Sequence, residues 1–406
     1  MTASRSLNWV LVILGIWGAH SACSDSESGD PDGSPADSGV TGGAGQDGGA
    51  SAGGSRAGTG GAGRVAGSSA VGGTESGGGS AGGDTTGGSD AGGGSDATGG
   101  ASASSGGAGT SGSSPSLENC PVFSADSPWN ADISGLPVHP NSDNFIDSVG
   151  RGQTMHPDFG TEWNGAPNGI PFVLVDASTP DVAINYTAWG DESDPGPFPI
   201  PADAPIEGGP DSDGDRHVLV IDTDACRLYE LGNAYPRSDG SWDANCGVMW
   251  DLTIDDRHPE GCTSADAAGL AIFPGLVRYD EVVEQGAVHH ALRVTVSSTQ
   301  RGYVSPASHY ASSDTNPDLP PMGLRFRMKS GYDCSSLSSE VQVLCTAFKR
   351  YGLIVADNGS DWYVSGAPDP HWSDDNLADL AQIPGSAFEV VDTGDPIVTS
   401  APDCVL

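Results

Sequence analysis

The sequence predicts a mainly β fold for residues 116–406, a single β-sandwich or jelly-roll-like module with one clear helix and a second short one. Three observations lead to this prediction. The composition changes near residue 116, from Gly, Ser, Ala, Thr and Asp to aromatic residues and Pro. After that point, short apolar runs alternate with turn-forming residues. Strong helical periodicity is confined to one segment.

Eight runs after residue 116 have the apolar and β-branched composition of short strands. The runs 217–221 and 228–231 flank a predicted hairpin turn at 222–225, and another turn-forming sequence occupies 357–360. The eight predicted strands are 170–175, 217–221, 228–231, 248–253, 291–297, 324–329, 353–356 and 362–365.

The clear helix is predicted from apolar residues at helical spacing. These residues are Leu337, Val341, Leu344, Cys345 and Phe348. Ser335 or Ser336 can cap the start of this helix, and Gly352 can close its end. A second short helix is expected at 373–382.

The N-terminal part predicts export and tethering. Residues 1–22 indicate a signal peptide, because their apolar stretch is too short to span a bilayer. Residues 23–115 predict a Gly/Ser-rich disordered tether, since they lack the apolar side chains that offset chain entropy. The run 20–23 resembles a bacterial lipobox, with His20 where Leu is usual. This resemblance implies lipidation of Cys23, and ordinary secretion is the alternative.

The charge of the module limits its partners. Of the chain's 54 acidic and 16 basic residues, 44 and 13 lie in 116–406, which gives the module a net charge of about −31. Such a field repels nucleic acid and anionic membrane surfaces. Neutral polymers, cations and locally recognised anions remain open as ligands. We expect a monomer that contacts a membrane only through an N-terminal lipid, with a polysaccharide or cell-surface glycan as its partner.

Seven cysteines lie in the module, and an exported protein meets an oxidising compartment, so disulfides are expected. Their spacing suggests Cys334–Cys345 and Cys246–Cys262, with Cys120–Cys404 joining the two ends of the module. Cys226 would be left over. This pairing is one hypothesis among many arrangements.

The strand 324–329 carries a basic stripe. Alternation places Leu324, Phe326 and Met328 on one face and Arg325, Arg327 and Lys329 on the other. One interpretation is a cleft floor where Arg325 and Arg327 hold the carboxylates of an acidic sugar. The alternative is a solvated outer face paired with neighbouring acids.

Two groups of residues could transfer protons. His309 and Tyr310 lie in a polar loop, where a histidine is free to titrate near neutral pH. Asp215 and His217 open a strong strand on the same side, so Asp215 could orient the imidazole. The alternatives are a surface loop and a polar turn.

The stretch 156–163 brings His156, Asp158 and Trp163 into one loop-like segment. Asp158 or Glu162 could act as an acid or base, His156 is a further catalytic candidate, and Trp163 could stack on a sugar face. Two carboxylates alone do not define a glycosidase, because their separation decides the mechanism.

Further candidates lie around the turn 357–360. Trp362 could stack on a sugar, and Asp357 and Asn358 could project into a cleft or form only the turn. The sequence predicts no cofactor and no metal, because it contains no CxxC pair and no HExxH motif. The acids of 211–215 are spaced like half of a calcium loop, which leaves calcium open there.

The stretches 194–201, 263–270, 275–281 and 351–359 resemble those of an uncharacterised family of secreted bacterial proteins. The resemblance covers most of 118–395 and implies one continuous module. It also implies an extracellular protein near polysaccharide metabolism, with no assigned reaction and no catalytic residues to transfer.

These observations favour a surface-tethered enzyme acting on polysaccharide, either a lyase or a glycoside hydrolase. In it, His217, His309 and Arg325 would share one site, with catalytic groups no more than about 15 Å apart because proton transfer needs hydrogen-bond reach. The alternatives are a non-catalytic glycan-binding or adhesion module and a structural envelope protein.

Overall fold

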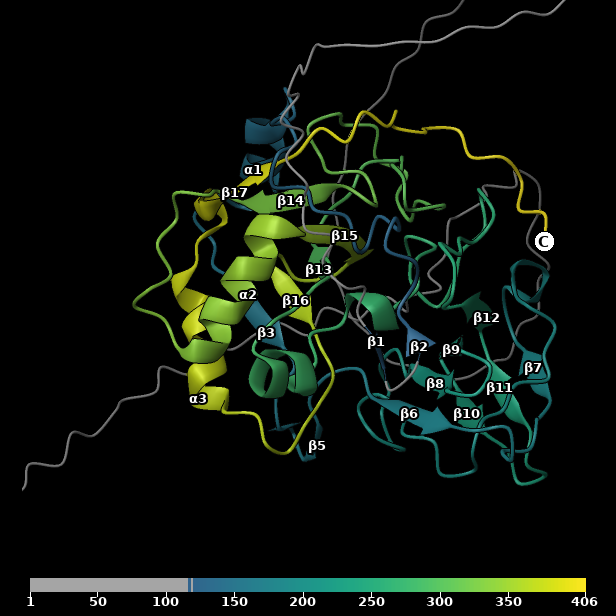
Figure 1. Cartoon of the computed structure of the whole chain (residues 1–406). Coiled ribbons are helices and arrows are strands. Elements are labelled where there is room, and N and C mark those ends of the chain that lie inside the picture. The colour runs from purple at the N-terminus through teal and green to yellow at the C-terminus, as the bar shows by residue number, and fades with distance from the viewer. Residues whose placement is uncertain (1–115, 118–119) are drawn as a thin grey trace, which may run out of the picture. The chain divides into compact units, whose positions relative to one another are not determined.

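Two mixed β-sheets, of six and four strands, form the core of the described chain (Figure 1). This computed structural model describes residues 116–117 and 120–406, so the predicted signal peptide, the tether and Cys23 lie outside the described residues. The larger sheet has the strand order β17 (Phe388–Val390), β14 (Arg325–Met328), β15 (Leu353–Asn358), β13 (Leu292–Val296), β16 (Tyr363–Ser365) and β3 (His156–Asp158).

The smaller sheet continues the core from the first half of the module. Its order is β12 (Cys246–Asp251), β9 (Arg227–Gly232), β8 (Val218–Asp222) and β6 (Phe172–Val175). Further short strands are β10 (Tyr235–Pro236), β11 (Trp242–Ala244) and β7 (Ile184–Tyr186) in one sheet, and the pairs β1 (Ser116–Leu117) with β2 (Cys120–Pro121) and β4 (Glu162–Trp163) with β5 (Ala166–Pro167).

The helices are few and short. The α-helices are α1 (Ser142–Val149), α2 (Ser339–Arg350) and α3 (Asp374–Leu377). Short 3₁₀-helices are η1 (Gly190–Glu192), η2 (Phe273–Gly275), η4 (Ala378–Gln382) and η5 (Gly385–Ala387), and η3 (Asp280–Gln285) is a π-helix. Helix α2 packs against β14 of the larger sheet (Figure 1).

The prediction of a mainly β fold is confirmed, and each of the eight predicted runs overlaps a strand. The clear helix is α2, although it begins after Ser338 rather than at Ser335 or Ser336. Gly352 follows it with a φ of 75°, where a side chain would collide with the Phe326 carbonyl oxygen. The second predicted helix is α3 followed by η4. Helix α1 was not predicted, since its eight residues carry only a short apolar face.

The finer prediction of a sandwich or jelly roll is not confirmed. Jelly rolls are built from antiparallel strands. Here β13 pairs with β15, β16 with β3, and β6 with β8 in parallel. The expected hairpin at 222–225 is confirmed, because β8 and β9 are antiparallel neighbours across it.

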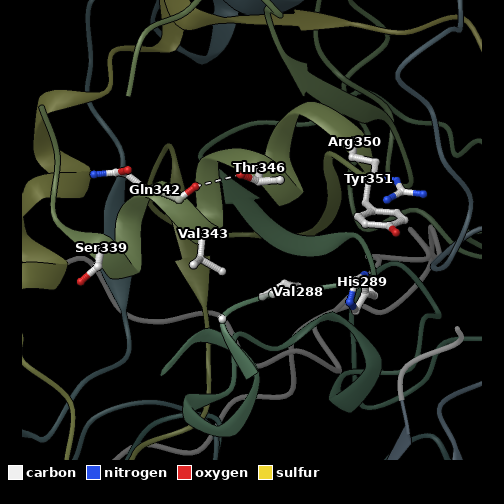
Figure 2. A pocket seen from close by; sticks show the side chains of 10 residues that line it. Val288, His289, Ser339, Gln342, Val343, Thr346, Arg350 and Tyr351 are labelled. Atoms are coloured by element: carbon white, nitrogen blue, oxygen red, sulfur yellow. Dashed lines mark hydrogen bonds between the residues drawn. The ribbon is translucent and has the colours of Figure 1, made fainter. Parts of the chain in front are cut away.

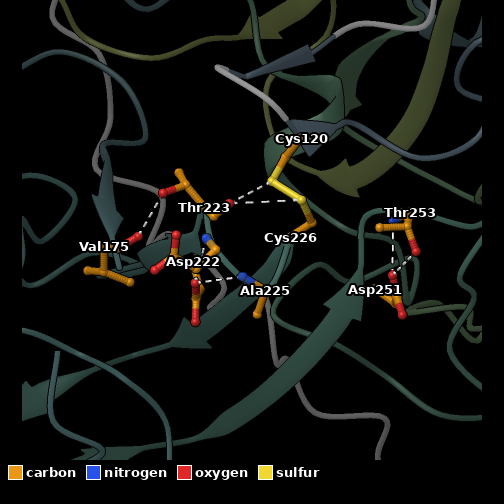
Figure 3. The surroundings of a disulfide bond; sticks show 9 residues. Cys120, Val175, Asp222, Thr223, Ala225, Cys226, Asp251 and Thr253 are labelled. Carbon is orange, nitrogen blue, oxygen red and sulfur yellow. Dashed lines mark hydrogen bonds between the residues drawn. A yellow bond between two sulfur atoms is a disulfide. The ribbon is translucent and has the colours of Figure 1, made fainter. Parts of the chain in front are cut away.

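Three disulfides link the described residues, and one of them was predicted. Cys334–Cys345 is confirmed. The predicted pairs Cys246–Cys262 and Cys120–Cys404 are wrong, because Cys262 bonds to Cys404. Cys226, expected to be left over, bonds to Cys120 (Figure 3). The turn that presents Cys226 is held by the Asp222 carboxylate, which accepts hydrogen bonds from the amides of Asp224 and Ala225.

The loop lengths of two disulfides predict unequal effects on stability. Cys120–Cys226 closes 106 residues, whereas Cys334–Cys345 closes 11. Because loop-closure entropy grows with loop length, removing the first pair should cost about 2 kcal/mol more than removing the second. Urea unfolding of the two double alanine variants measures this difference. Equal losses would contradict the entropic explanation.

The disulfides indicate an oxidising, extracellular environment. Within the part of the chain that the structure describes, no helix is long and apolar enough to cross a membrane.

Candidate functional site

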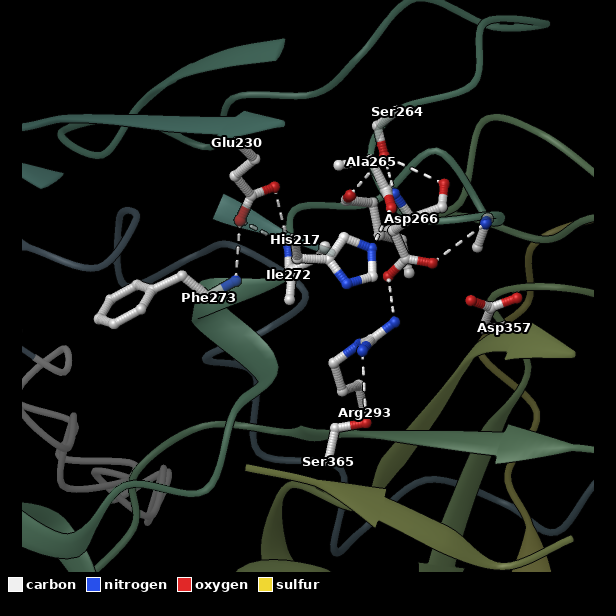
Figure 4. A network of polar contacts seen from close by, with 12 residues as sticks. His217, Glu230, Ser264, Ala265, Asp266, Ile272, Phe273, Arg293, Asp357 and Ser365 are labelled. Carbon is white, nitrogen blue, oxygen red and sulfur yellow. Dashed lines mark hydrogen bonds and ion pairs between the residues drawn. The ribbon is translucent and has the colours of Figure 1, made fainter. Parts of the chain in front are cut away.

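Five carboxylates gather around two buried cations where the two large sheets meet, and we call this group the carboxylate cluster. The cations are His217 and Arg293, both nearly inaccessible to solvent. The carboxylates are those of Asp158, Glu207, Asp215, Asp266 and Asp357. Figure 4 shows His217, Asp266, Arg293 and Asp357 of this group.

The larger sheet supplies part of the cluster from adjacent strands. Arg293 lies on β13, and its Nη1 donates to the Ser365 hydroxyl on β16 over 3.3 Å. Ser365 is in turn the register partner of Asp158 on the edge strand β3. Asp357 lies near the end of β15, on the opposite side of β13. The order β15-β13-β16-β3 therefore brings these side chains to one region of the sheet.

The segment 263–270 supplies the counter-charge of Arg293. The Asp266 carboxylate is fully buried and accepts from Arg293 Nη2 over 3.1 Å (Figure 4). It also accepts from the Ala268 amide, which lies 3.1 Å from the Ala356 carbonyl oxygen on β15. Asp266 and Arg293 thus form a buried ion pair at the base of the cluster.

His217, just before β8, is held as an imidazolium. Its Nδ1 lies 2.6 Å from Glu207 Oε2, and its Nε2 lies 2.9 Å from the Ala265 carbonyl oxygen. Both of these partners are acceptors, so both ring nitrogens carry hydrogens. Burial alone would lower the pKa of His217, but the Glu207 carboxylate outweighs it and raises that pKa to about 9.

This geometry corrects two predictions. His217 has no free ring nitrogen to act as an acid or base, so its role is to position and neutralise Glu207. The carboxylate that orients the ring is Glu207, not Asp215. Asp215 is half-buried near the same pair, and burial raises its pKa.

The pKa values of two carboxyl groups in the cluster move in opposite directions. Asp158 is exposed at the surface. Partial desolvation by the surrounding protein is the largest cause that raises its pKa to about 6, and the negative charge of Glu207 is the second. Burial would also raise the pKa of Glu207, but His217 and Arg293 overcome it and lower that pKa. The side chain of Glu207 is 24% exposed, and among the described residues its Oε1 has no hydrogen-bond partner.

The Glu207–His217 pair predicts a pH-dependent stability. The folded pKa of His217, about 9, lies above its unpaired value of 6.5. The stabilisation is therefore complete below pH 6.5 and is lost as the pH rises through 9, by up to about 1.4 kcal/mol per pH unit. Urea unfolding at several pH values measures this slope. Glu207→Gln should flatten it, and an unchanged slope in that variant would contradict the assignment.

His309 and Tyr310 lie near the cluster but not in it. His309 Nδ1 donates to the Ala267 carbonyl oxygen over 2.9 Å, two residues along the chain from the carbonyl that His217 contacts. The rings of His309 and Tyr310 stack at 5.9 Å. Segment 263–270 therefore joins His309 to the surroundings of the cluster.

Arg325 and Arg327 do not form a basic stripe on a cleft floor or a solvated face, because both are buried on β14. Arg327 pairs with Glu389 and donates to the carbonyl oxygens of Ile133, Ser134 and Leu136. Its guanidinium is therefore committed to contacts inside the protein and lies away from a solvent-borne sugar. Arg325 forms no hydrogen bond or ion pair with a residue of the cluster among the described residues, and its Nε donates to the Tyr351 carbonyl oxygen instead.

The aromatic candidates divide by exposure. Trp163 on β4 is 70% exposed, five residues after Asp158, and remains available to a ligand. His156 is exposed on β3 and stacks on Tyr363 at 4.2 Å. Trp362 is fully buried and donates to the Gly150 carbonyl oxygen, so it cannot stack on a sugar.

The turn around Asp357 combines a cluster residue with a structural one. Burial raises the pKa of Asp357 well above the usual range, and the nearby Asp266 adds to the effect. The Asn358 side chain instead bridges the Thr299 hydroxyl and the Ala311 carbonyl oxygen. Asp357 therefore belongs to the cluster, whereas Asn358 fixes neighbouring loops.

The possible calcium loop at 211–215 encloses a protein cation. Arg216 Nη1 donates to the carbonyl oxygens of Pro210 and Ser212 at 3.0 and 2.8 Å. Among the described residues, no group of three or more His, Cys, Asp or Glu side chains is arranged to hold a metal ion.

Another buried carboxylate, Glu230, is structural (Figure 4). It accepts from Trp250 Nε1 and from the amides of Ile272 and Phe273. Burial raises its pKa to about 7. These donors fix the start of η2 against β9, and no side of the group faces solvent.

A hollow of about 340 Å³ lies elsewhere, between α2 and residues 286–289 (Figure 2). Val288, Val343 and Tyr351 line it, and no cluster residue does. Its charged side chain, Arg350, is paired with Asp132 at 2.9 Å. His289 and Ser339 also line the hollow.

Glu207, Asp266 and Arg293 were not predicted as site residues. Arg293 could have been found as a single charge inside an apolar run. Asp266 lies in one of the stretches that carry the family resemblance, but its neighbours are small and featureless. Glu207 has no local signal, since its partner His217 is ten residues away and faces it only in the fold.

No protein-family model, curated protein or solved structure matches the chain.

Proposed function

We propose that the protein hydrolyses glycosidic bonds in an extracellular glycan, with Asp158 as general acid and Glu207 as the ionised carboxylate. The observation that carries this proposal is that the pKa of Asp158 is raised while the pKa of Glu207 is lowered. The charge of Glu207 is one of the causes that raise the pKa of Asp158. Glycoside hydrolysis requires one carboxyl that keeps its proton to a higher pH than a second, ionised carboxylate.

Each group has a defined task in this reaction. Asp158 gives its proton to the leaving-group oxygen as the glycosidic bond breaks. Glu207 acts on the sugar's anomeric carbon through Oε1, either as a nucleophile or by taking a proton from an attacking water. His217 and Arg293 keep Glu207 ionised, and Trp163 offers a solvent-facing ring for a sugar to stack on.

A hydrolase fits better than a lyase. Lyase action on uronates needs cations around the sugar carboxylate, but Arg325 and Arg327 are buried in the core. The cluster itself carries more acids than bases, which disfavours a negatively charged substrate. A neutral polysaccharide is therefore the proposed substrate class. The signal peptide and Cys23 lipid anchor stay part of this proposal, holding the module outside the cell.

An activity panel tests the proposal. Full-length protein is incubated with neutral and acidic polysaccharides, and two signals are followed: new reducing ends and the ultraviolet absorbance of unsaturated uronates. We expect reducing ends from a neutral polymer without that absorbance. Unsaturated products would identify a lyase. Binding without turnover would favour the glycan-binding module, for which exposed Trp163 is the supporting observation.

A further inference from the structure

Arg325 is a buried cation without a counter-charge. Its residue surface is 4% exposed, and its Nε donates to the Tyr351 carbonyl oxygen over 3.0 Å. Among the described residues, its Nη2 has no hydrogen-bond partner, and no carboxylate lies within ion-pair distance. The other buried arginines of the sheets differ, since Arg293 pairs with Asp266 and Arg327 with Glu389.

A small hollow of about 20 Å³ lies against Arg325. Its lining includes the apolar residues Leu324, Val391 and Ile397 and the polar residues His139 and Thr393. A space of this size holds one water-sized species. It is too small for a sugar or for the carboxylate of a uronate.

Burying an unpaired guanidinium is unfavourable, because the charge loses its hydration and gains no opposite charge in return. Burial lowers the pKa of Arg325 to about 9, so the group is still charged at neutral pH. A water molecule would satisfy Nη2 but would not neutralise it. An anion does both.

Two acids also line the hollow and shape its selectivity. One carboxylate oxygen of Asp392 accepts from the Gly394 amide over 2.9 Å, and Asp395 is exposed. Neither forms an ion pair with Arg325. Their charges oppose multivalent anions more strongly than monovalent ones.

We propose that the hollow beside Arg325 binds a small monovalent anion of halide size, which serves as the counter-ion of this buried arginine. The hollow shares no lining residue with the carboxylate cluster, so its test does not depend on the proposed hydrolase activity.

Thermal unfolding of the full-length protein tests the proposal. Sodium gluconate, whose anion is too large for the hollow, is replaced by sodium chloride at constant ionic strength. A ligand that binds only the folded state raises the Tm, here by roughly 3–6 °C for a site filled at high chloride. Arg325→Met should abolish this rise, while Arg237→Met, which removes an exposed arginine, should keep it.

A second measurement covers the case in which Arg325→Met does not fold. Crystals of the wild-type protein soaked in bromide should show an anomalous peak within hydrogen-bond distance of Nη2. Asp395→Asn should strengthen the chloride response, because it removes a repelling charge. A wild-type Tm that is equal in chloride and gluconate, with no bromide peak, would overturn the proposal and leave water at Nη2. A response that appears only in Asp395→Asn would also overturn it, with Asp395 as the counter-charge.

Discussion

Replacing Asp158 by Asn should lower kcat/KM for a neutral polysaccharide by about 10²–10⁴-fold, because an amide of the same shape cannot give its proton to the leaving group. Binding should persist, since Asp158 has no hydrogen-bond partner among the described residues whose loss would disturb the fold. The measurement is the initial rate of reducing-end release, together with the Kd for the same polymer.

Two controls make the Asp158 result specific to acid catalysis. Asp375→Asn changes an exposed acid outside the cluster and should leave the rate unchanged. A glycoside with a good leaving group, such as a nitrophenol, should be affected less by Asp158→Asn, because that oxygen leaves without protonation. An equal loss on both kinds of substrate would argue against a general-acid role.

Replacing Asp266 by Asn should destabilise the protein by about 3–5 kcal/mol, since it removes the hydrogen-bonded counter-charge of Arg293 in the core. Asp266 is fully buried and the Arg293 side chain is 3% exposed, so solvent cannot compensate for the lost partner. Urea unfolding measures the change. The matched control is Asp243→Asn in the exposed pair with Arg237, for which about 0–1 kcal/mol is expected.

The double variant Asp266→Asn/Arg293→Met separates pairing from packing. Removing the charge of Arg293 as well should recover part of the lost stability, because apolar residues can often replace a buried ion pair. If Asp266→Asn alone costs less than 1 kcal/mol, Asp266 is not the main counter-charge of Arg293, and the ion pair assigned at the base of the cluster would be wrong.

The sequence predicted those strands whose own residues form a recognisable apolar run. Runs such as 218–221 and 353–356 are fully buried, and their apolar composition makes them recognisable. Edge strand β3 has three residues, His156–Asp158, and carries no pattern of its own. The cysteines show the same limit. The 11-residue loop of Cys334–Cys345 was predictable from spacing, whereas Cys120–Cys226 is set by the fold.

On strand β14 the alternation of side chains was predicted correctly, but the solvent exposure of its arginines was not. Leu324, Phe326 and Met328 do oppose Arg325 and Arg327, as predicted. However, β14 lies between β15 and β17, and both of its faces are covered. Sequence alternation gives the relative orientation of side chains but cannot tell whether the polar face meets water.

The candidate site was predictable in part for a similar reason. Asp158, Asp215, His217 and Asp357 lie next to strand ends, where site residues often occur. Their partners Glu207 and Asp266 come from loops whose position depends on tertiary contacts. The acid–base pair became visible only once Glu207 was placed against His217.

The pH dependence of kcat/KM on a neutral polysaccharide tests the central claim most directly. Because Asp158 must be protonated to act as an acid and its pKa is raised to about 6, activity should fall as the pH rises through that value. Activity that instead increases through pH 6 would mean that Asp158 must lose its proton to act, and it would contradict the assignment of acid and base in the carboxylate cluster.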